Sequence, residues 1–287
     1  MMKKILAVLT MPMIIGLAYF CRGQTKNFRL QEILSDVPNN AAWEVAPLPE
    51  KNQEEVQKKL RQTFRYLGSG KQSHAFIGSD RKTVLKFFRH NDLSMLRLMK
   101  HFPSNWVWNT MQKVDPRPVF GSCILAYREL REPSGIFYVH INKTRGDLGR
   151  VTVLDNIGVA HDVDLDSTEF VLQDYCELIG ARIGSQMKAG DLEGAQASVK
   201  AIFDAIEVWS RQGIHIENPA IRRNIGFSGD KVVMLDSGSL VKDERLKTPD
   251  QVQREVKKAT HGLGRWIRKR HPSLYPYFEQ ELASRAN

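Results

Sequence analysis

A short hairpin pattern in the last third of the chain constrains the fold more than any other stretch. Two apolar runs, "IGF" at 225–227 and "VVML" at 232–235, flank the turn sequence "SGD". Asn224 stands just before the first run, and Asp236 follows the second. Because an antiparallel hairpin brings its open ends together, we expect the amide of Asn224 and the carboxylate of Asp236 to lie at one mouth.

A second hairpin pattern, closer to the N-terminus, combines a glycine-rich turn with a lysine inside a strand. In "LGSGKQSHAFIG", Gly68 and Gly70 let the backbone approach an anion without a Cβ atom in the way. Lys86 lies in the middle of the strand "VLKFF", so its side chain points to the face opposite Leu85 and Phe87. Many ordinary hairpins contain glycine, but a lysine inside the next strand favours an anion site.

These residues resemble the opening of a protein-kinase-like domain, where a glycine-rich loop covers the phosphates of ATP and a strand lysine contacts them. Gly68 and Gly70 match the first two glycines of that loop, and Ser73 stands at the place of the third. Ala75 takes the position of the usual valine, and Lys86 matches the lysine. The resemblance implies that this part of the chain binds ATP through Gly68, Gly70, Ser73 and Lys86.

The first hairpin fits the same resemblance. An amphipathic helix expected at 191–212, ended by Gly213, leads into "HIENPAIRRN", which is similar to a kinase catalytic loop. Asn224 matches the metal-binding asparagine, and Asp236 matches the aspartate of the D-F-G motif. Amide and carboxylate oxygens are hard ligands suited to Mg²⁺, so the resemblance implies a magnesium site at the hairpin mouth.

The catalytic loop departs from the pattern of active kinases at its base. Active families place an aspartate two residues after the histidine, but here Glu217 follows His215 at that place. The resemblance makes Glu217 and His215 the candidate catalytic residues. The loop from Glu217 to Asn224 is also two residues longer than usual. Glu217 can act as the base only within roughly 3.2 Å of the proton that it removes, so the sequence leaves both an active and an inactive loop open.

Two further elements follow from the resemblance. A helix expected at 122–135, ended by Pro133 and Gly135, is the equivalent of the kinase helix whose glutamate pairs with the strand lysine. We expect Glu129 in that role, rather than Glu132 at the fraying end. The strand "FVLQDYC" is expected to lead into a hinge, where the backbone of Gln173 to Tyr175 would contact adenine.

The first residues have the pattern of an export signal. Two lysines precede an apolar run from Ile5 to Cys21, and "CRG" provides small residues for cleavage after Gly23. The run is slightly shorter than the roughly 20 residues that span a bilayer, so an uncleaved membrane anchor stays open. The sequence therefore predicts an exported or membrane-anchored protein, without fixing on which side the domain lies.

The overall charge is basic, with a formal net charge of +10 from 42 Lys and Arg against 32 Asp and Glu. Such a balance favours anionic partners, although a solvated basic surface explains it as well. The densest basic cluster, "RWIRKRHP" at 265–272, has too few aromatic residues for a nucleic-acid platform, so we expect no specific nucleic-acid binding. The three cysteines have no metal-binding spacing and form no disulfide framework.

Together these patterns predict an α+β chain with a two-lobed protein-kinase-like fold. We expect a signal or anchor at 1–23, a helical linker at 24–60, a small β-rich N-lobe at 61–172 and a mainly helical C-lobe at 173–287. The predicted function is transfer of phosphate from ATP, with Mg²⁺, to an unknown protein or small molecule. The alternatives are a pseudokinase that binds nucleotides or proteins, and an exported interaction protein on the same scaffold.

Overall fold

The chain divides into two compact units in the computed structural model. The first unit comprises Met1–Pro118 and Tyr138–Gln173, and the second comprises Val119–Phe137 and Asp174–Asn287. The structure describes residues 23–285 apart from residues 27, 47, 71, 91–116, 217–220 and 236–239.

Both units contain helices and strands, so the predicted α+β class is confirmed. The signal or anchor predicted at 1–23 lies outside the described residues, except for Gly23. Within the described ranges, no helix has both the length and the apolar character needed to cross a bilayer.

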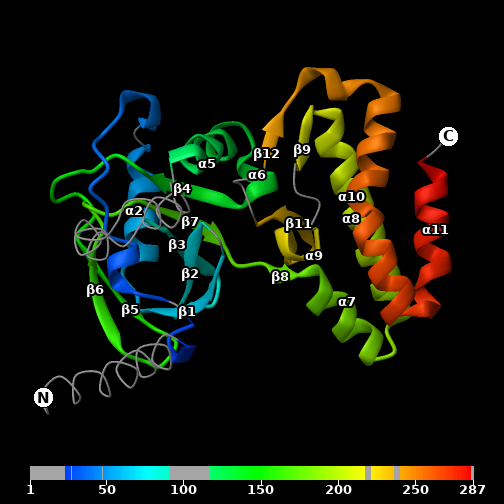
Figure 1. The fold of residues 1–287 in the computed structure, drawn as a ribbon, viewed down its shortest axis with the longest axis horizontal. Coiled ribbons are helices and arrows are strands. Elements are labelled where there is room, and N and C mark those ends of the chain that lie inside the picture. The colour runs from blue at the N-terminus through cyan, green and yellow to red at the C-terminus, as the bar shows by residue number, and fades with distance from the viewer. Residues whose placement is uncertain are drawn as a thin grey trace, which may run out of the picture. The chain divides into compact units, whose positions relative to one another are not determined.

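The first unit is built on a seven-stranded sheet with the order β4-β7-β3-β2-β1-β5-β6 (Figure 1). The pairs β1–β2, β2–β3 and β5–β6 are antiparallel, whereas β1 and β5 are parallel. The strands are β1 Phe64–Ser69, β2 Ser73–Gly78, β3 Thr83–Phe88, β4 Ile136–His140, β5 Arg150–Leu154, β6 Ala160–Asp164 and β7 Phe170–Asp174. Each strand expected from the sequence in this unit is therefore confirmed.

One face of the sheet is held by a chain of aromatic contacts. Along β2, buried and half-exposed residues alternate, as expected for a strand with one covered face. The ring of Phe76 lies 5.1 Å from Phe28 and 5.8 Å from Phe87, and Phe87 lies 6.3 Å from Phe170. Helix α2 Glu50–Leu60, predicted as an amphipathic helix, buries Val56 and Leu60.

The turn between β2 and β3 is organised by Asp80. Its carboxylate accepts hydrogen bonds from the backbone N–H groups of Lys82 and Thr83, both at 2.9 Å, and from the hydroxyl of Thr83 at 2.6 Å. Partial burial acts to raise the pKa of Asp80, but these hydrogen bonds outweigh it and lower the pKa from 3.8 to about 2. The turn is thus held by a charged acceptor.

The second unit is mainly helical, with two small sheets. One sheet has the order β11-β10-β8, and the other pairs β12 with β9. The helices are α5 Arg117–Glu129, α6 Arg131–Ser134, α7 Ile179–Lys188, α8 Leu192–Arg211, α9 Ile221–Asn224, α10 Pro249–Arg270 and α11 Tyr275–Ser284. The strands are β8 Glu177–Leu178, β9 Ile214–Ile216, β10 Ile225–Ser228, β11 Lys231–Met234 and β12 Leu240–Lys242.

Two of the sequence predictions for this unit are confirmed. The strands β10 and β11 pair in the register Ile225 to Met234, around a turn at Gly229 with a φ of +61°. Helix α8 ends at Arg211, and Gly213 follows in the left-handed region at φ +77°. A Cβ atom at Gly213 would lie 2.9 Å from the carbonyl oxygen of Asp243, so packing requires glycine there too.

The helix predicted as one element at 122–135 is wrong in its extent. The chain is helical from Arg117 to Glu129, breaks at Leu130, and forms a second short helix, α6. Pro133 does not end that helix, because it lies in the first turn, where its missing N–H has no helical partner. Gly135 ends it in the left-handed conformation, with a φ of +61°.

Helices α8, α10 and α11 form the core of this unit (Figure 1). Phe278 of α11 is buried, and its ring lies 5.2 Å from Phe203 of α8. A Cβ atom at Gly264 of α10 would lie only 2.6 Å from this ring. Glycine at this position in the helix is therefore required for α11 to pack closely.

We expect the Gly264→Ala variant to be less stable than the wild type, although alanine favours helix formation by up to about 1 kcal/mol over glycine. The cost of overpacking against a buried ring is about 1–3 kcal/mol. Gly184→Ala in α7 is the matched control, because a Cβ atom there meets no atom within 4 Å. Urea unfolding should show a loss for Gly264→Ala and a small gain for Gly184→Ala. A gain in both variants would contradict the packing.

Asp80→Ala should lower the free energy of unfolding at pH 7 by about 1 kcal/mol, because the hydrogen bonds of this carboxylate are lost. The effect is no larger because solvent screens a carboxylate that is mostly exposed. The pKa of this group is depressed in the folded state, so its contribution is present above pH 3.8 and is lost as the pH falls through about 2. The difference from the wild type should therefore shrink in acid. Asp36→Ala, at an exposed carboxylate, should change stability little. A pH-independent difference for Asp80→Ala would show that its charge is not involved.

Candidate functional site

A row of three residues crosses the strands β1, β2 and β3 of the first unit. Gly68 on β1 is paired with Ala75 on β2, and Ala75 is paired with Lys86 on β3. Directly paired residues point to the same face of a sheet, and neighbouring strands lie about 4.8 Å apart. The row is therefore a strip about 10 Å wide, in which the two residues paired across from Lys86 have small side chains.

The same face continues with apolar residues that the sequence analysis missed. Ile77 of β2 and Val84 of β3 are paired, and each lies two residues from a member of the row. Because side chains alternate along a strand, Ile77 and Val84 share the face of Ala75 and Lys86. Val84 is buried, as is Phe88 two residues after Lys86, whereas Ile77 is partly exposed. Of the two added residues, Ile77 therefore offers the apolar side chain beside the lysine.

The glycines of the β1–β2 hairpin are not required by local backbone geometry. Neither Gly68 nor Gly70 has a φ in the left-handed region. Among the described residues, a Cβ atom at Gly68 would meet no atom within 4 Å, and one at Gly70 would lie 3.8 Å from the carbonyl oxygen of Ser73. The N–H of Gly70 donates to that oxygen at 2.8 Å, so this amide closes the hairpin. The glycines instead leave open space outside the hairpin.

A buried charged network fixes the base of this hairpin. Ser69, at the end of β1, lies 2.5 Å from Nδ1 of His74, whose Nε2 is 3.0 Å from the carboxylate of Glu32. Arg89, just after β3, forms an ion pair with the same carboxylate at 3.0 Å and donates to the carbonyl oxygen of Gly70 at 3.3 Å. His74 and Glu32 are both buried. The network ties three segments of the chain to the glycine-rich turn.

The predicted hinge residues fall where the chain passes from the first unit to the second. The first unit ends at Gln173, which is buried, and the second begins at Asp174. The N–H of Asp174 donates to the carbonyl oxygen of Gly135 at 2.9 Å, so this backbone donor is engaged. Tyr175 is exposed. Contact of this segment with adenine stays a prediction.

Asn224 is buried at the mouth of the β10–β11 hairpin. It ends α9, directly before β10, and its carbonyl oxygen accepts a hydrogen bond from the N–H of Leu235 at 2.7 Å. The hairpin pairing thus extends to the residue before Asp236. Asp236 and Glu217 lie outside the described residues, so their predicted roles stay predictions. In the rest of the chain, the described residues contain no cluster of three or more His, Cys, Asp or Glu that could hold a metal ion.

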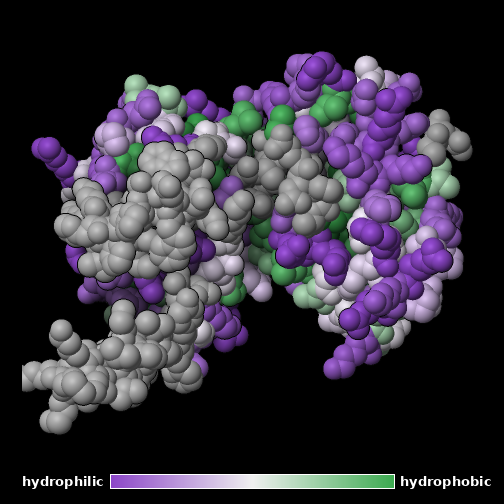
Figure 2. Space-filling model, in the orientation of Figure 1, coloured by the Kyte–Doolittle hydropathy of each residue, from purple (hydrophilic) through white to green (hydrophobic). Residues whose placement is uncertain are grey.

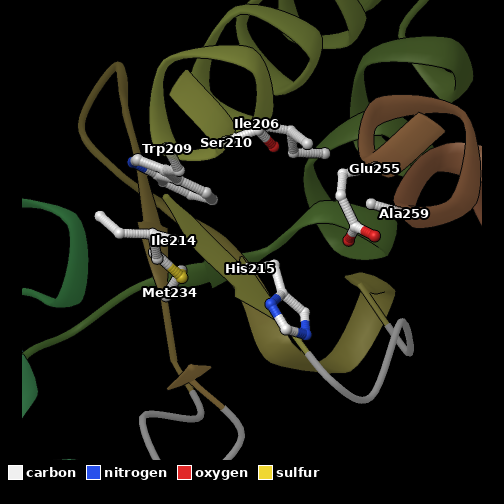
Figure 3. Close-up of a pocket in the computed structure, with 8 residues that line it drawn as sticks. All are labelled: Ile206, Trp209, Ser210, Ile214, His215, Met234, Glu255 and Ala259. Atoms are coloured by element: carbon white, nitrogen blue, oxygen red, sulfur yellow. The ribbon is translucent and has the colours of Figure 1, made fainter. Parts of the chain in front are cut away.

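His215 lies on β9, paired with Val241 of β12, and lines a small cavity (Figure 3). The cavity volume is about 10 Å³, which is room for a single water molecule. Nδ1 of His215 is buried and has no hydrogen-bond partner among the described residues. The cavity is lined by Ile206, Trp209, Ser210, Ile214, His215, Met234, Glu255 and Ala259. It is too small for a nucleotide. A catalytic role of His215 stays a prediction.

Glu129, at the end of α5, has a partner within its own unit. Its carboxylate accepts a hydrogen bond from Lys242 of β12, and this hydrogen bond raises the pKa of Lys242. Both side chains are well exposed, so solvent screens the pair and it contributes little to stability. The predicted pairing of Glu129 with Lys86 stays a prediction.

Comparisons with known proteins give little further information. No protein-family model matches the chain, and no curated protein matches it. A solved structure of the bifunctional kinase-methyltransferase WbdD matches with a TM-score of 0.35 and 12% sequence identity. The match covers 75% of this chain and 42% of that one, so the chain spans less than half the length of this structure. The likeness is too slight to bear on function.

Glu32→Gln should lower the free energy of unfolding by roughly 3 kcal/mol, because it leaves Arg89 beside a neutral partner in a buried site. Glu54→Gln, at an exposed position on α2, is the control and should change stability by less than about 0.5 kcal/mol. Urea unfolding at pH 7 measures both. Equal effects of the two substitutions would contradict the buried network.

Proposed function

We propose that the chain is a kinase-like, ATP-binding protein and transfers phosphate to an unknown acceptor. The observation that supports this most strongly is the row of Gly68, Ala75 and Lys86 on one face of the first unit's sheet. It places a lysine beside two small residues, next to a hairpin whose Gly68 has no described atom within 4 Å of an added Cβ atom. Binding of a triphosphate needs a cation that neutralises its charge and a backbone that the phosphates can approach closely.

In this proposal the first unit holds the nucleotide. The ammonium group of Lys86 neutralises phosphate charge, and Gly68, Gly70 and Ser73 let the hairpin lie close to the phosphates. Ile77, which is partly exposed, offers an apolar side chain on the same face. The network of Ser69, His74, Glu32 and Arg89 keeps the hairpin in a single conformation, so that less conformational entropy is lost on binding.

In the second unit, Asn224 and Asp236 are the proposed ligands of Mg²⁺, because their oxygens are hard donors. A bound Mg²⁺ would neutralise charge on the phosphates. Glu217 is the proposed general base, which removes the proton of the acceptor hydroxyl. His215, two residues before Glu217, is the second proposed catalytic residue.

A pseudokinase is the second candidate function. The feature that favours it is the missing base aspartate, together with the two additional residues before Asn224. Glutamate is one methylene longer than aspartate, and the loop is two residues longer. The carboxylate of Glu217 can then lie outside hydrogen-bond reach of the acceptor hydroxyl. In that case nucleotide binding is kept and turnover is lost.

ATP with Mg²⁺ should raise the thermal unfolding temperature of the chain by mass action, and Lys86→Met should abolish the shift. Methionine keeps the length of the aliphatic stem and removes the charge. Lys82→Met is the control, since Lys82 is an exposed lysine in the turn before the same strand. Absence of a shift in the wild type at millimolar ATP, or an equal loss in both variants, would contradict nucleotide binding at Lys86.

Glu217→Gln should lower phosphate transfer by about 10²- to 10⁴-fold, the usual contribution of a general base, and leave ATP binding unchanged. The measurement is release of labelled phosphate from ATP, with and without candidate acceptors. Wild-type turnover that survives the substitution would reject Glu217 as the base. Intact ATP binding without turnover in the wild type would reject the transferase and support the pseudokinase.

A further inference from the structure

One face of α10 presents an unbroken stripe of basic side chains. Successive residues of a helix are rotated by 100°, so seven basic residues between positions 254 and 269 fall within an arc of about 120°. All seven are exposed, and the buried residues of α10, such as Val256 and Leu263, lie on the opposite side. The seven are Arg254, Lys257, Lys258, His261, Arg265, Arg268 and Lys269.

The charge of this stripe is not neutralised by neighbouring carboxylates. Lys258 lies 3.4 Å from Glu255, but no carboxylate among the described residues pairs with the other six. Helix α8 in the same unit shows the contrast, because Lys200 pairs with Asp204 at 2.7 Å and Arg211 pairs with Glu207 at 2.7 Å. A basic helix face that is merely solvated would be expected to alternate in sign, as α8 does.

The stripe is long, straight and strongly charged. It extends about 22 Å along α10, at 1.5 Å per residue. The helix contains seven Lys and Arg against two carboxylates, and so carries half of the formal net charge of +10. Figure 2 shows hydrophilic residues gathered along α10, the helix that lies between α8 and α11 in Figure 1. A uniform ridge of positive charge fits an extended anionic surface.

The types of side chain in the arc indicate which class of anionic partner fits it. A protein partner normally needs apolar or aromatic anchors at the centre of the interface, and the arc contains none. Single-stranded nucleic acid is held by aromatic side chains on which bases stack. Two aromatic residues lie close to the arc but outside it. Trp266 packs edge-on against His271, at 4.9 Å between ring centroids. Tyr275 of α11 stacks on Phe278, and the guanidinium group of Arg268 lies 5.8 Å from the ring centroid of Tyr275. A polybasic stripe without anchors is sufficient for a surface of anionic lipid headgroups.

From these observations we infer that the exposed face of α10 docks on an anionic phospholipid surface. The attraction is electrostatic, between the six Lys and Arg side chains of the stripe and lipid phosphate or carboxylate groups, and it needs no insertion of α10 into the bilayer. The apolar face of α10 stays in the core of the second unit, packed against α8 and α11. This docking is independent of the proposed nucleotide site.

The test measures binding of the full chain to vesicles. Phosphatidylcholine vesicles with and without phosphatidylserine are compared by co-sedimentation. Each Lys or Arg near an anionic surface strengthens binding roughly fivefold. The triple variant Lys257→Gln/Arg265→Gln/Arg268→Gln should therefore lose about 100-fold in affinity for phosphatidylserine vesicles. Binding should also weaken as salt rises from about 0.1 M to about 0.5 M, because salt screens exposed charges.

The matched control removes three exposed lysines of the first unit, in the triple variant Lys51→Gln/Lys58→Gln/Lys82→Gln. It makes the same change in net charge and should reduce binding far less. The apolar run at 5–21 is common to all proteins compared, so its own affinity for lipid cancels. Equal losses in both triple variants, or equal binding to both kinds of vesicle, would overturn the inference. Binding to duplex DNA or RNA stronger than to anionic vesicles, lost in the α10 variant, would overturn it as well.

Discussion

The pairing register of β1, β2 and β3 is the constraint on which the first unit depends. With Gly68, Ala75 and Lys86 in one row, the large side chains of Phe76 and Phe87 fall on the opposite face, where both are fully buried. A slip of one residue between two strands would exchange the faces. It would then turn a lysine toward the core and expose phenylalanines, so the hydrophobic core fixes the side on which Lys86 is presented.

Charged groups in the first unit are placed where they hold turns. Asp80 closes the turn before β3, and the carboxylate of Glu32 joins His74 and Arg89 beneath the glycine-rich turn. Buried ion pairs add little to stability compared with apolar packing, but breaking one is costly. Their effect here is to define a single conformation for the hairpin on both sides of the lysine strand. In the second unit, apolar packing has this effect without charged groups, because Gly264 lets α10 and α11 pack in close contact.

Much of the local structure follows from the sequence, because it depends on neighbouring residues. The β10–β11 hairpin is specified by its turn residues, and α8 by its apolar stripe and Gly213. The break at Leu130 was not predicted, since Pro133 is compatible with the first turn of a helix as well as with its end. The network around Glu32 could not be predicted either, because His74 and Glu32 are 42 residues apart. The partner of Glu129 lies 113 residues away, and nothing in local sequence indicates it.

The central claim is that the face carrying Lys86 binds the phosphates of ATP. An acyl-phosphate derivative of ATP tests it directly, because a lysine amine beside the bound phosphates displaces the phosphate and forms an amide with the acyl group. After reaction with the full chain, peptide mass spectrometry locates the modified lysines. We predict modification of Lys86, prevented by an excess of ATP with Mg²⁺. Modification spread over exposed lysines such as Lys82, or modification of Lys86 that ATP does not prevent, would contradict the account.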